Sequence, residues 1–298
     1  MYIKHTSGRA GKLEAKGRIV LITGGTAGIG KETARTLANA GARVYLTGRN
    51  EKQAREVATE IAVKTGNRNV FGLQLDLCDF ESIRRLAKYM LEEESHLHVL
   101  INNAGLVRAL RDLTRRVNKQ GLEETMCANH FGHFLLTKLL LDRLKASAPA
   151  RIINVSSTLH RFGRIELDNC NFEQKNYTPW RAYNNSKLAN ILFTRELSLR
   201  LIDSGVTVNT CHPGVINTSI FRDVKQPAKA LGEFFICPVL KTAEEGAQTS
   251  IYLAASPEVE NVTGEYFMDC QPAAPCLKAL DYKVAKELWE LSDRLTDQ

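Results

Sequence analysis

The segment Ile19–Gly30, with the sequence IVLITGGTAGIG, constrains the fold of this chain more than any other stretch. It opens with a run of aliphatic residues, which is typical of a strand buried on both faces of a parallel sheet. A turn follows that contains Gly24, Gly25, Gly28 and Gly30. The next residues, Lys31–Ala38, are good helix formers. The segment therefore predicts a strand, a glycine turn and a helix in that order.

This combination is suited to hold a phosphate group. Glycines let a ligand approach the backbone closely, and a helix N-terminus presents free N–H groups and the positive end of its dipole. The spacing Gly24-x3-Gly28-x-Gly30 differs from the common G-x-G-x-x-G fingerprint. The alternative interpretation is a tight turn that binds no ligand. The strand before the turn and the helix after it favour the phosphate site over this alternative.

Size and composition indicate one large α/β domain in a reducing compartment. The chain has 298 residues, of which 44% are hydrophobic. No uncharged apolar stretch reaches the roughly 18 residues of a membrane-spanning helix, and residues 1–17 lack the apolar core of a signal peptide. The 7 cysteines are scattered without a C-x-x-C pair. We therefore expect a cytoplasmic protein.

The formal net charge of +7 is concentrated in two segments, because the rest of the chain is formally neutral. Residues 1–17 carry four basic side chains against one acidic, and residues 108–119 carry five against one. A flexible tail with a solvated loop, peripheral contact with an anionic intracellular membrane, and an acidic partner all stay open as interpretations. Nucleic acid is not expected, because neither segment interleaves aromatic residues with its charges.

Apolar runs that predict strands alternate with longer segments that predict helices. Strands are expected at 19–22, 43–47, 70–75, 99–101, 151–155, 206–211 and 266–268. Helices are expected after the glycine turn and at 50–65, 79–93, 121–145, 180–203, 242–255 and 283–295, with irregular segments at 158–179 and 213–241. This alternation predicts a single doubly wound parallel sheet with helices on both faces. We expect a basic N-terminal extension, 1–17, and one domain, 18–298.

Ligands of such sheets bind beyond the carboxyl ends of the strands, so the residues after each strand are candidates for a site. The second strand ends in Thr47-Gly48-Arg49, without a carboxylate for a ribose 2′-hydroxyl. Arg49 could instead form a forked contact with a 2′-phosphate, which predicts NADP(H) rather than NAD(H). The alternative is a solvated surface arginine.

Polar residues also follow the third, fourth and fifth strands. Asp76 could accept a hydrogen bond from an adenine amino group or cap a local turn. The segment Asn102–Gly105 suits close approach to a ribose and stabilisation of neighbouring strands. Ser156 and Ser157 could bind a substrate carbonyl. A nucleophilic serine is the alternative, although no G-x-S-x-G elbow surrounds it.

Tyr183 and Lys187 lie four residues apart in a predicted helix, so both project from one face. A free tyrosine has a pKa of about 10, and a neighbouring ammonium stabilises its phenolate and lowers that pKa. Taken alone, Y-x-x-x-K is common by chance and usually structural.

Together, TGGTAGIG, Asp76, NNAG, INVSS, YNNSK and His212-Pro213-Gly214 occur in an order that resembles the short-chain dehydrogenase/reductase family, from about Gly17 onward. The resemblance implies a Rossmann fold and four catalytic roles. It makes Tyr183 the general acid/base, Lys187 the residue that lowers its pKa and holds the nicotinamide ribose, Ser157 the group that polarises the carbonyl, and Asn129 a member of the proton relay. The NADP(H) contacts expected on this basis are Gly24, Thr26, Gly28, Ile29, Gly30, Arg49, Asp76, Leu77, Asn103, Ala104, Gly105, Tyr183, Lys187, Pro213, Gly214, Val215 and Thr218.

Four longer segments are similar to the retinol dehydrogenase-like branch of that family: NHFGHFLLTKLLL (129–141), INVSSTLHRFGRI (153–165), SKLANILFTREL (186–197) and GAQTS (246–250). Many relatives begin with an apolar membrane anchor, which we do not expect here, and the loop after Gly105 is unusually rich in arginine. The resemblance implies oxidation or reduction of a small apolar aldehyde, ketone or alcohol that is retinoid-like, steroid-like or a lipid aldehyde.

Residues 213–241 contain several large apolar side chains, which could form a substrate lid or close an ordinary core. No metal site is expected, because His130, His133 and His160 lack partners at ligand spacing. The alternatives to an enzyme are a catalytically idle NADPH-binding sensor or scaffold, and a protein that binds membranes or RNA through its basic segments. Whether copies of the chain form a homo-oligomer stays open.

Overall fold

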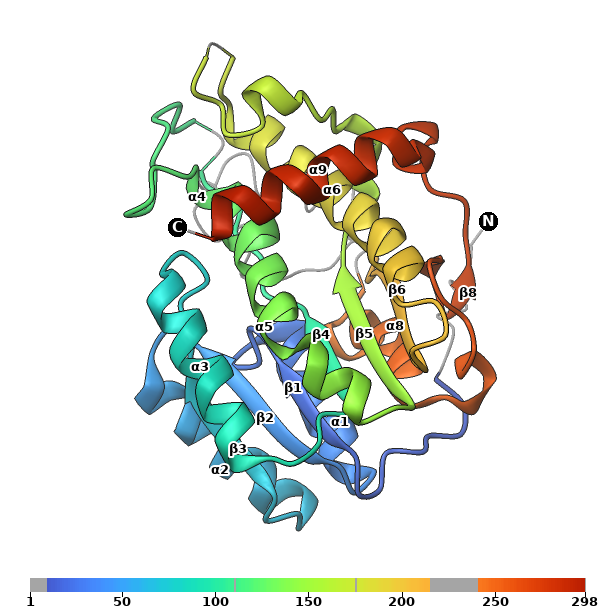
Figure 1. The fold of residues 1–298 in the computed structure, drawn as a ribbon. Coiled ribbons are helices and arrows are strands. Elements are labelled where there is room, and N and C mark those ends of the chain that lie inside the picture. Colours follow the sequence, from blue (N-terminus) through green and yellow to red (C-terminus); the bar gives the residue numbers. More distant parts are fainter. Residues whose placement is uncertain (1–9, 110, 175, 215–240, 298) are drawn as a thin grey trace, which may run out of the picture.

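The computed structural model describes residues 10–109, 111–174, 176–214 and 241–297. Within these residues, an eight-stranded sheet has the order β3-β2-β1-β4-β5-β6-β7-β8 (Figure 1). The strands are β1 (Ile19–Ile22), β2 (Arg43–Gly48), β3 (Val70–Gln74), β4 (Val99–Asn102), β5 (Ala150–Val155), β6 (Val206–His212), β7 (Tyr266–Met268) and β8 (Gln271–Pro272). The predicted α/β fold is therefore confirmed.

All neighbouring strands from β3 to β7 run parallel, and β1 lies beside both β2 and β4. The chain moves outward from β1 in one direction through β2 and β3, and then returns to the other side of β1 at β4. A crevice opens at such a reversal of strand order, beyond the carboxyl ends of the strands. One prediction was wrong: β7 is not the last strand, because β8 adds an antiparallel pair at the edge.

The helices agree with the predicted ones at most boundaries. They are α1 (Gly28–Asn39), α2 (Glu51–Thr65), α3 (Phe80–Glu93), α4 (Glu124–Met126), α5 (Gly132–Ala146), α6 (Pro179–Arg200), α8 (Ala243–Ala255) and α9 (Tyr282–Thr296). The segment expected to be irregular before α6 contains two short 3₁₀ helices, Thr158–Phe162 and Leu167–Asn169.

The helix predicted at 121–145 differs from the structure, because it begins at Glu124 and is interrupted by a π-helical turn at Cys127–Phe131. In this turn the N–H of Gly132 donates to the carbonyl of Cys127, five residues earlier. A Cβ on Gly132 would lie 2.4 Å from the carbonyl oxygen of Leu77, so the loop after β3 packs directly on the helix here. Such π-turns often occur at functional sites.

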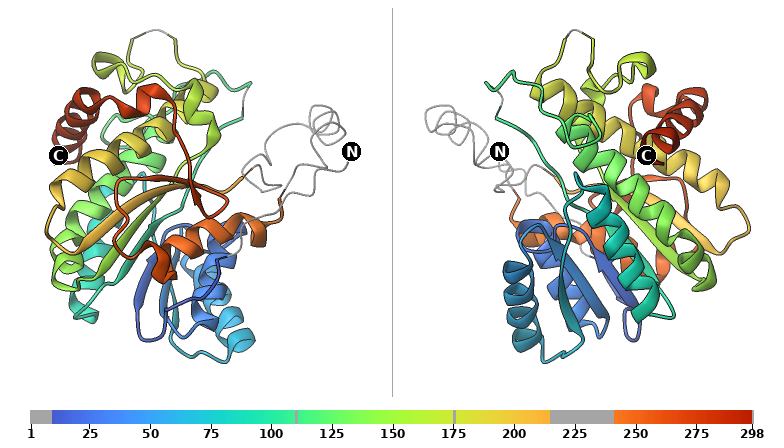
Figure 2. Two further views of the ribbon diagram at one scale, coloured as in Figure 1. Left: turned by 90° about the vertical axis from the view of Figure 1, so that its right-hand side faces the viewer. Right: turned by 60° about the vertical axis from the view of Figure 1, so that its left-hand side comes forward.

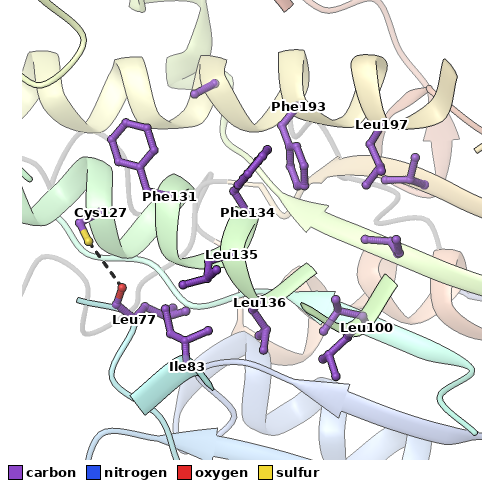
Figure 3. Packing of buried hydrophobic residues seen from close by; sticks show 14 of the residues in the cluster. Leu77, Ile83, Leu100, Cys127, Phe131, Phe134, Leu135, Leu136, Phe193 and Leu197 are labelled. Atoms are coloured by element: carbon purple, nitrogen blue, oxygen red, sulfur yellow. Dashed lines mark hydrogen bonds between the residues drawn. The ribbon is translucent and has the colours of Figure 1, made fainter. Parts of the chain in front are cut away.

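Two layers of helices cover the sheet (Figures 1 and 2). Residues of α1, α2 and α8 form one hydrophobic cluster on the first face, and residues of α3, α5, α6 and α9 form the other cluster on the second. Figure 3 shows part of the second cluster, where Phe134 of α5 meets Phe193 of α6 with ring centroids 5.4 Å apart. The site residues that come from α5 and α6 are thus fixed by a packed core.

Residues 10–17 pack onto the sheet domain instead of leading away from it. The side chains of Ala10 and Ala15 are buried, and the N–H of Glu14 donates to the carbonyl of Ala255 at 2.7 Å. Among the residues described above, no helix combines the length and the apolar character needed to cross a membrane.

Candidate active site

The glycine turn between β1 and α1 leaves no room for a side chain at Gly24, Gly25 or Gly30. Gly24 has a φ of +66°, in the left-handed region that favours glycine. A Cβ on Gly30 would lie 2.3 Å from the carbonyl oxygen of Gly24, and one on Gly25 would lie 2.6 Å from Cβ of Leu46. The turn therefore folds tightly only with glycine at these positions, as a cradle for a phosphate requires.

The N-terminus of α1 has no side-chain cap. Its N-cap residue is Ala27, whereas Asn50 caps α2 and Thr178 caps α6 through side-chain hydrogen bonds. Uncapped N–H groups at the positive end of a helix attract anions. The end of α1 and the cradle beside it, which includes the predicted contacts Thr26, Gly28 and Ile29, therefore fit the pyrophosphate of a dinucleotide.

The end of β2 packs against this turn. A Cβ on Gly48 would lie 2.6 Å from Cγ2 of Thr26, so the strand approaches the turn closely. Arg49 follows, and its side chain is exposed. Within the described part of the chain, this guanidinium forms no hydrogen bond or ion pair, which leaves it free to meet an anionic group at the edge of the cradle.

Asp76 and Leu77 follow β3 at the same edge of the sheet. Oδ1 of Asp76 accepts from the N–H of Cys78 at 2.9 Å, so the aspartate caps a local turn, one of its two predicted roles. Its contact with an adenine stays a prediction. Leu77 is buried, and its carbonyl accepts from the thiol of Cys127 at 3.6 Å (Figure 3).

The segment after β4 ties neighbouring strands together. Nδ2 of Asn103 donates to the carbonyl of Thr23 at 2.8 Å. The N–H groups of Asn103 and Ala104 both donate to the hydroxyl oxygen of Thr23, at 2.9 and 3.0 Å. The buried Asn102 donates to Oδ1 of Asn154 on β5 at 2.8 Å. The stabilisation of neighbouring strands that the sequence predicted is therefore present, and Gly105 follows in an exposed position.

Asn129 lies in the π-helical turn and is completely buried. Its Oδ1 accepts from the N–H of Leu106 at 2.6 Å, and its Nδ2 donates to the carbonyl of the same residue at 2.9 Å. Nδ2 also donates to Oγ of Ser186 on α6 at 2.9 Å. The side chain of Asn129 therefore joins the loop after β4 to α6.

The two serines after β5 have different environments. The hydroxyl of Ser156 is buried and donates to the carbonyl of Lys187 at 2.7 Å, so it fixes α6 on the sheet. Oγ of Ser157 accepts from the N–H of Leu159 at 3.2 Å. Ser157 also lies within reach of Tyr183, where donation from its hydroxyl acts to lower the pKa of the phenol.

Tyr183 and Lys187 occupy one buried face of α6, one helical turn apart. Nζ of Lys187 lies 5.4 Å from the ring centroid of Tyr183. The same ammonium donates to the carbonyl of Val155 at the end of β5, at 3.2 Å. The structure therefore brings three of the four predicted catalytic side chains together, and Asn129 reaches the same helix through Ser186.

The expected lowering of the pKa of Tyr183 does not appear in the chain alone. Burial raises the pKa of Tyr183 to about 12, although the hydrogen bond from Ser157 acts in the opposite direction. Burial also lowers the pKa of Lys187 to about 8, so its ammonium loses the proton more readily than a solvated lysine does. Desolvation is the largest cause of both shifts, because both side chains are buried.

Pro213 and Gly214 follow β6, and Gly214 has a φ of +93°. A Cβ at Gly214 would lie 2.6 Å from Cδ of Lys241, so Gly214 and Lys241 approach each other closely. The predicted contacts Val215 and Thr218, and the apolar residues of the predicted lid, lie outside the described residues.

Comparisons with known proteins agree with this arrangement. A family model described as short chain dehydrogenase matches residues 18–229. This chain belongs to the short-chain dehydrogenase/reductase family. It is therefore an oxidoreductase that interconverts carbonyl and alcohol groups with a nicotinamide cofactor.

Relatives and solved structures place the chain within this family. Retinol dehydrogenase 12 of Homo sapiens is 45% identical over 283 residues, which cover 95% of this chain and 87% of the relative. Retinol dehydrogenase 11 of Homo sapiens is 46% identical over 282 residues, or 94% of this chain and 86% of the relative. The chain is thus of the retinol dehydrogenase-like branch.

An uncharacterised protein from Mycobacterium paratuberculosis superposes with a TM-score of 0.77 at 33% identity, covering 98% of both chains. The NADP complex of RhlG from Pseudomonas aeruginosa superposes with a TM-score of 0.70 at 27% identity, covering 85% of this chain and 95% of that one. The Rossmann fold expected from the sequence is therefore shared with solved members of the short-chain dehydrogenase/reductase family.

Two polar residues at this short-chain dehydrogenase/reductase site were not predicted from the sequence. Thr23 accepts two N–H groups from the segment after β4, and Ser186 links Asn129 to the backbone of Tyr183, whose carbonyl lies 2.7 Å from the Ser186 hydroxyl. Both stand inside quoted motifs, TGGTAGIG and YNNSK. Their hydroxyls were the only signal in the sequence, because Thr23 and Ser186 meet Asn103, Ala104 and Asn129 across more than fifty residues.

Two of the three histidines considered as metal ligands, His130 and His160, have other partners. Nε2 of His130 lies 2.9 Å from Oγ of Ser292 on α9. Nδ1 of His160 lies 2.6 Å from the carbonyl of Ser157, and its Nε2 accepts from the N–H of Cys276 at 3.0 Å. In the described residues, no group of three His, Cys, Asp or Glu side chains could hold a metal ion.

The basic loop, residues 108–119, uses much of its charge internally. Arg108 pairs with Asp112 and Glu124, and Arg116 also pairs with Asp112. Arg115 donates from Nε to the carbonyl of Asn171 at 2.9 Å. These contacts shape the loop itself. Its contact with an anionic membrane stays a prediction.

Proposed function

We propose that this oxidoreductase uses NADP(H) to interconvert an apolar aldehyde or ketone and its alcohol, with Tyr183, Lys187, Ser157 and Asn129 as its catalytic set. The observation that carries this proposal is the convergence of Ser157 and Lys187 on Tyr183 at the carboxyl end of β5. The bound nicotinamide would supply or accept the hydride, and the chain supplies the proton and the placement.

Tyr183 is the proton donor in the direction of reduction. Because the pKa of Tyr183 is raised to about 12, its phenol keeps its proton at neutral pH. The hydride adds to the carbonyl carbon and the phenol proton goes to the carbonyl oxygen, which balances the conversion to an alcohol. The hydroxyl of Ser157, which lies beside Tyr183, can turn to donate to the developing oxyanion.

Lys187 opposes the charge that Tyr183 acquires. Once the proton leaves, Tyr183 is a buried phenolate. A nearby ammonium offsets the desolvation cost of this negative charge. In the oxidative direction the same ammonium favours the phenolate that must accept the proton. Asn129 holds α6 through Ser186, and with it the backbone of Tyr183.

The preference for NADP(H) rests on Arg49. Its guanidinium is exposed, has no partner within the described residues, and follows a strand that offers no carboxylate for a ribose. The NADP complex of RhlG from Pseudomonas aeruginosa, with the same fold, is consistent with this preference. We assign Gly24, Gly28 and Gly30 to the pyrophosphate.

The substrate class rests on sequence and relatives. Residues 213–241 are rich in apolar side chains, and two of the relatives are named retinol dehydrogenases. We therefore favour retinoid-like, steroid-like or lipid aldehydes, bound under this segment as a lid over one catalytic domain, 18–298. A cytoplasmic enzyme could meet such substrates where they partition from membranes.

The deciding experiment follows NADPH consumption with retinal, steroid ketones and medium-chain aldehydes. Tyr183→Phe removes the transferable proton but keeps the ring, and it should cut the rate of reduction by about 10² to 10⁴. The variant should stay folded and bind NADPH as before. A rate near that of the wild type would make Ser157 or a water the acid instead.

The rival function, an idle NADPH sensor or scaffold, gives a different outcome in the same assay. It requires tight NADPH binding without turnover of any carbonyl in the panel, and equal behaviour of the wild type and the Phe variant.

A further inference from the structure

We propose that His133 is a positioning residue that holds the phosphate-binding turn and the π-helical turn of Asn129 in one fixed relation. The inference deepens the function proposed above and rests on it. His133 lies on α5, one helical turn after Asn129, and its side chain is 2% exposed.

Both ring nitrogens of His133 have a partner. Nδ1 lies 3.1 Å from the backbone carbonyl of Asn129, and Nε2 lies 2.8 Å from the hydroxyl of Thr23. A carbonyl oxygen can only accept, so Nδ1 carries the proton. In a neutral imidazole Nε2 is then an acceptor, and the hydroxyl of Thr23 donates to it.

Burial keeps this imidazole neutral, because it lowers the pKa of His133 to about 3. The neutral form is the one that the contacts require. A charged ring would place an N–H at Nε2, so the hydroxyl of Thr23 could no longer donate to it. The longer contact of that hydroxyl, 3.4 Å to the carbonyl of Ile101, would be its remaining acceptor.

Thr23 extends the chain of hydrogen bonds to the cofactor side. Its Oγ1 accepts from the N–H groups of Asn103 and Ala104. Every donor in this series therefore points the same way: from the two amides to Thr23, from Thr23 to His133, and from His133 to Asn129. Series of this kind strengthen each bond through polarisation.

The series connects three segments that meet at the site: the turn after β1, the end of β4 and the π-helical turn. Its two ends belong to different tasks, because Thr23 begins the phosphate cradle and Asn129 holds the helix of Tyr183. His133 is the only side chain among the described residues that contacts both of these residues through its polar atoms. We infer that it sets how the cofactor and the proton donor face each other.

Substitutions can separate the two contacts. His133→Leu removes both while keeping an apolar side chain of similar size. His133→Asn can present an N–H near the position of Nδ1, and His133→Gln can present an oxygen near the position of Nε2. His130→Leu is the matched control, since His130 is equally buried nearby but contacts Ser292 on α9.

The first readout does not depend on activity. Hydrogen exchange at the amides of Asn103 and Ala104, which donate to Thr23, should become about tenfold faster in His133→Leu, the size expected for one net hydrogen bond. The dissociation constant for NADPH should rise by a similar factor. His130→Leu should lower the melting temperature and leave both quantities within twofold of the wild type.

The second readout is the split between binding and turnover. His133→Gln should recover NADPH affinity more than kcat, and His133→Asn should recover kcat more than affinity. Equal exchange rates and affinities in folded His133→Leu and wild type would overturn the inference, and so would the same changes in His130→Leu. If His133→Leu does not fold, the Gln and Asn variants decide by the same split, and equal recovery in both would overturn it.

Failure of the proposed function has a different signature. In that case the wild type turns over none of the carbonyls, while the hydrogen exchange of residues 103 and 104 still tests His133.

Discussion

At the scale of single residues, the site depends on two buried groups whose pKa values shift in opposite directions, away from each other. Burial raises the pKa of Tyr183 to about 12 and lowers that of Lys187 to about 8. Each shift disfavours the charged form of its group, because burial removes that group from water. The proton that Tyr183 gives up during reduction therefore needs Lys187 in its charged form at that moment.

This dependence predicts the pH profile. Below pH 8 Lys187 is charged and Tyr183 is protonated, so kcat/KM for reduction should be level. Above pH 8 Lys187 loses its proton while Tyr183 keeps its own, so kcat/KM should fall by about tenfold per pH unit. Lys187→Met should be slow at all pH values and lack this limb. A wild-type profile that stays level to pH 10 would contradict the assignment.

A second prediction at this scale concerns cofactor choice. Arg49→Ala should weaken NADPH binding by tenfold or more, about 1.4 kcal/mol, while NADH binding changes little. Arg68→Ala is a suitable control, because Arg68 is also exposed but precedes β3 at the opposite end of the sheet from the site. Isothermal titration with both cofactors measures the difference. Equal losses for NADPH and NADH would show that Arg49 does not read the phosphate.

At the scale of elements, the tight turn between β1 and α1 predicts the effect of one added carbon. Gly30→Ala would place Cβ 2.3 Å from the carbonyl oxygen of Gly24 and 2.5 Å from Nδ2 of Asn103. The backbone must shift, so we expect a loss of about 1 to 3 kcal/mol in stability and the loss of most NADPH affinity.

The control for this variant is Gly66→Ala at the end of α2. Gly66 has a φ of +69° but open space around it, so alanine there should cost about 1 kcal/mol without changing affinity. Urea unfolding and NADPH titration of both variants separate the effects. Unchanged NADPH binding in Gly30→Ala would show that the turn is not the cradle.

The elements themselves were largely predictable, because their signals are local. Asn50 and Gly66 bracket α2 as expected, through a side-chain cap and a left-handed C-cap. The π-helical turn at Cys127–Phe131 was not predictable, since it follows from the approach of the loop after β3 to Gly132. The local pattern of apolar residues does not predict a contact between segments that lie more than fifty residues apart in the sequence.

The candidate site shows the same division. Ser157, Tyr183 and Lys187 were identified from short motifs and lie together. The raised pKa of Tyr183 was not foreseen, because the extent of burial depends on how α6 packs against the sheet. The polar chain through Thr23 and His133 was also missed, since its bonds join residues 110 positions apart.

At the scale of the whole molecule, buried histidines make stability depend on pH. Burial lowers the pKa of His130 to about 4 and that of His133 to about 3, from about 6.5 in an unfolded chain. Below pH 6.5 the unfolded chain therefore binds protons that the folded chain cannot. As the pH falls from 6.5 to 4, each histidine should therefore lower the free energy of unfolding by about 1.4 kcal/mol per pH unit.

Urea unfolding at pH 6 and pH 5 measures this effect. His130→Leu removes one contribution, so its free energy of unfolding should fall less steeply than that of the wild type, by about 1.4 kcal/mol per pH unit. Parallel slopes in the two proteins would mean that His130 is not held neutral in the folded chain.

The short antiparallel pair at the end of the sheet also limits how copies of this chain can meet. A strand at an edge offers unpaired backbone groups to any other chain, which is a common route to aggregation. Here β8 covers β7 with only Gln271 and Pro272, and a proline has no N–H to donate. The edge at β8 therefore offers few backbone groups with which a strand of another molecule could pair. Any homo-oligomer of this chain should use helix or loop surfaces instead of continuing the sheet past β8.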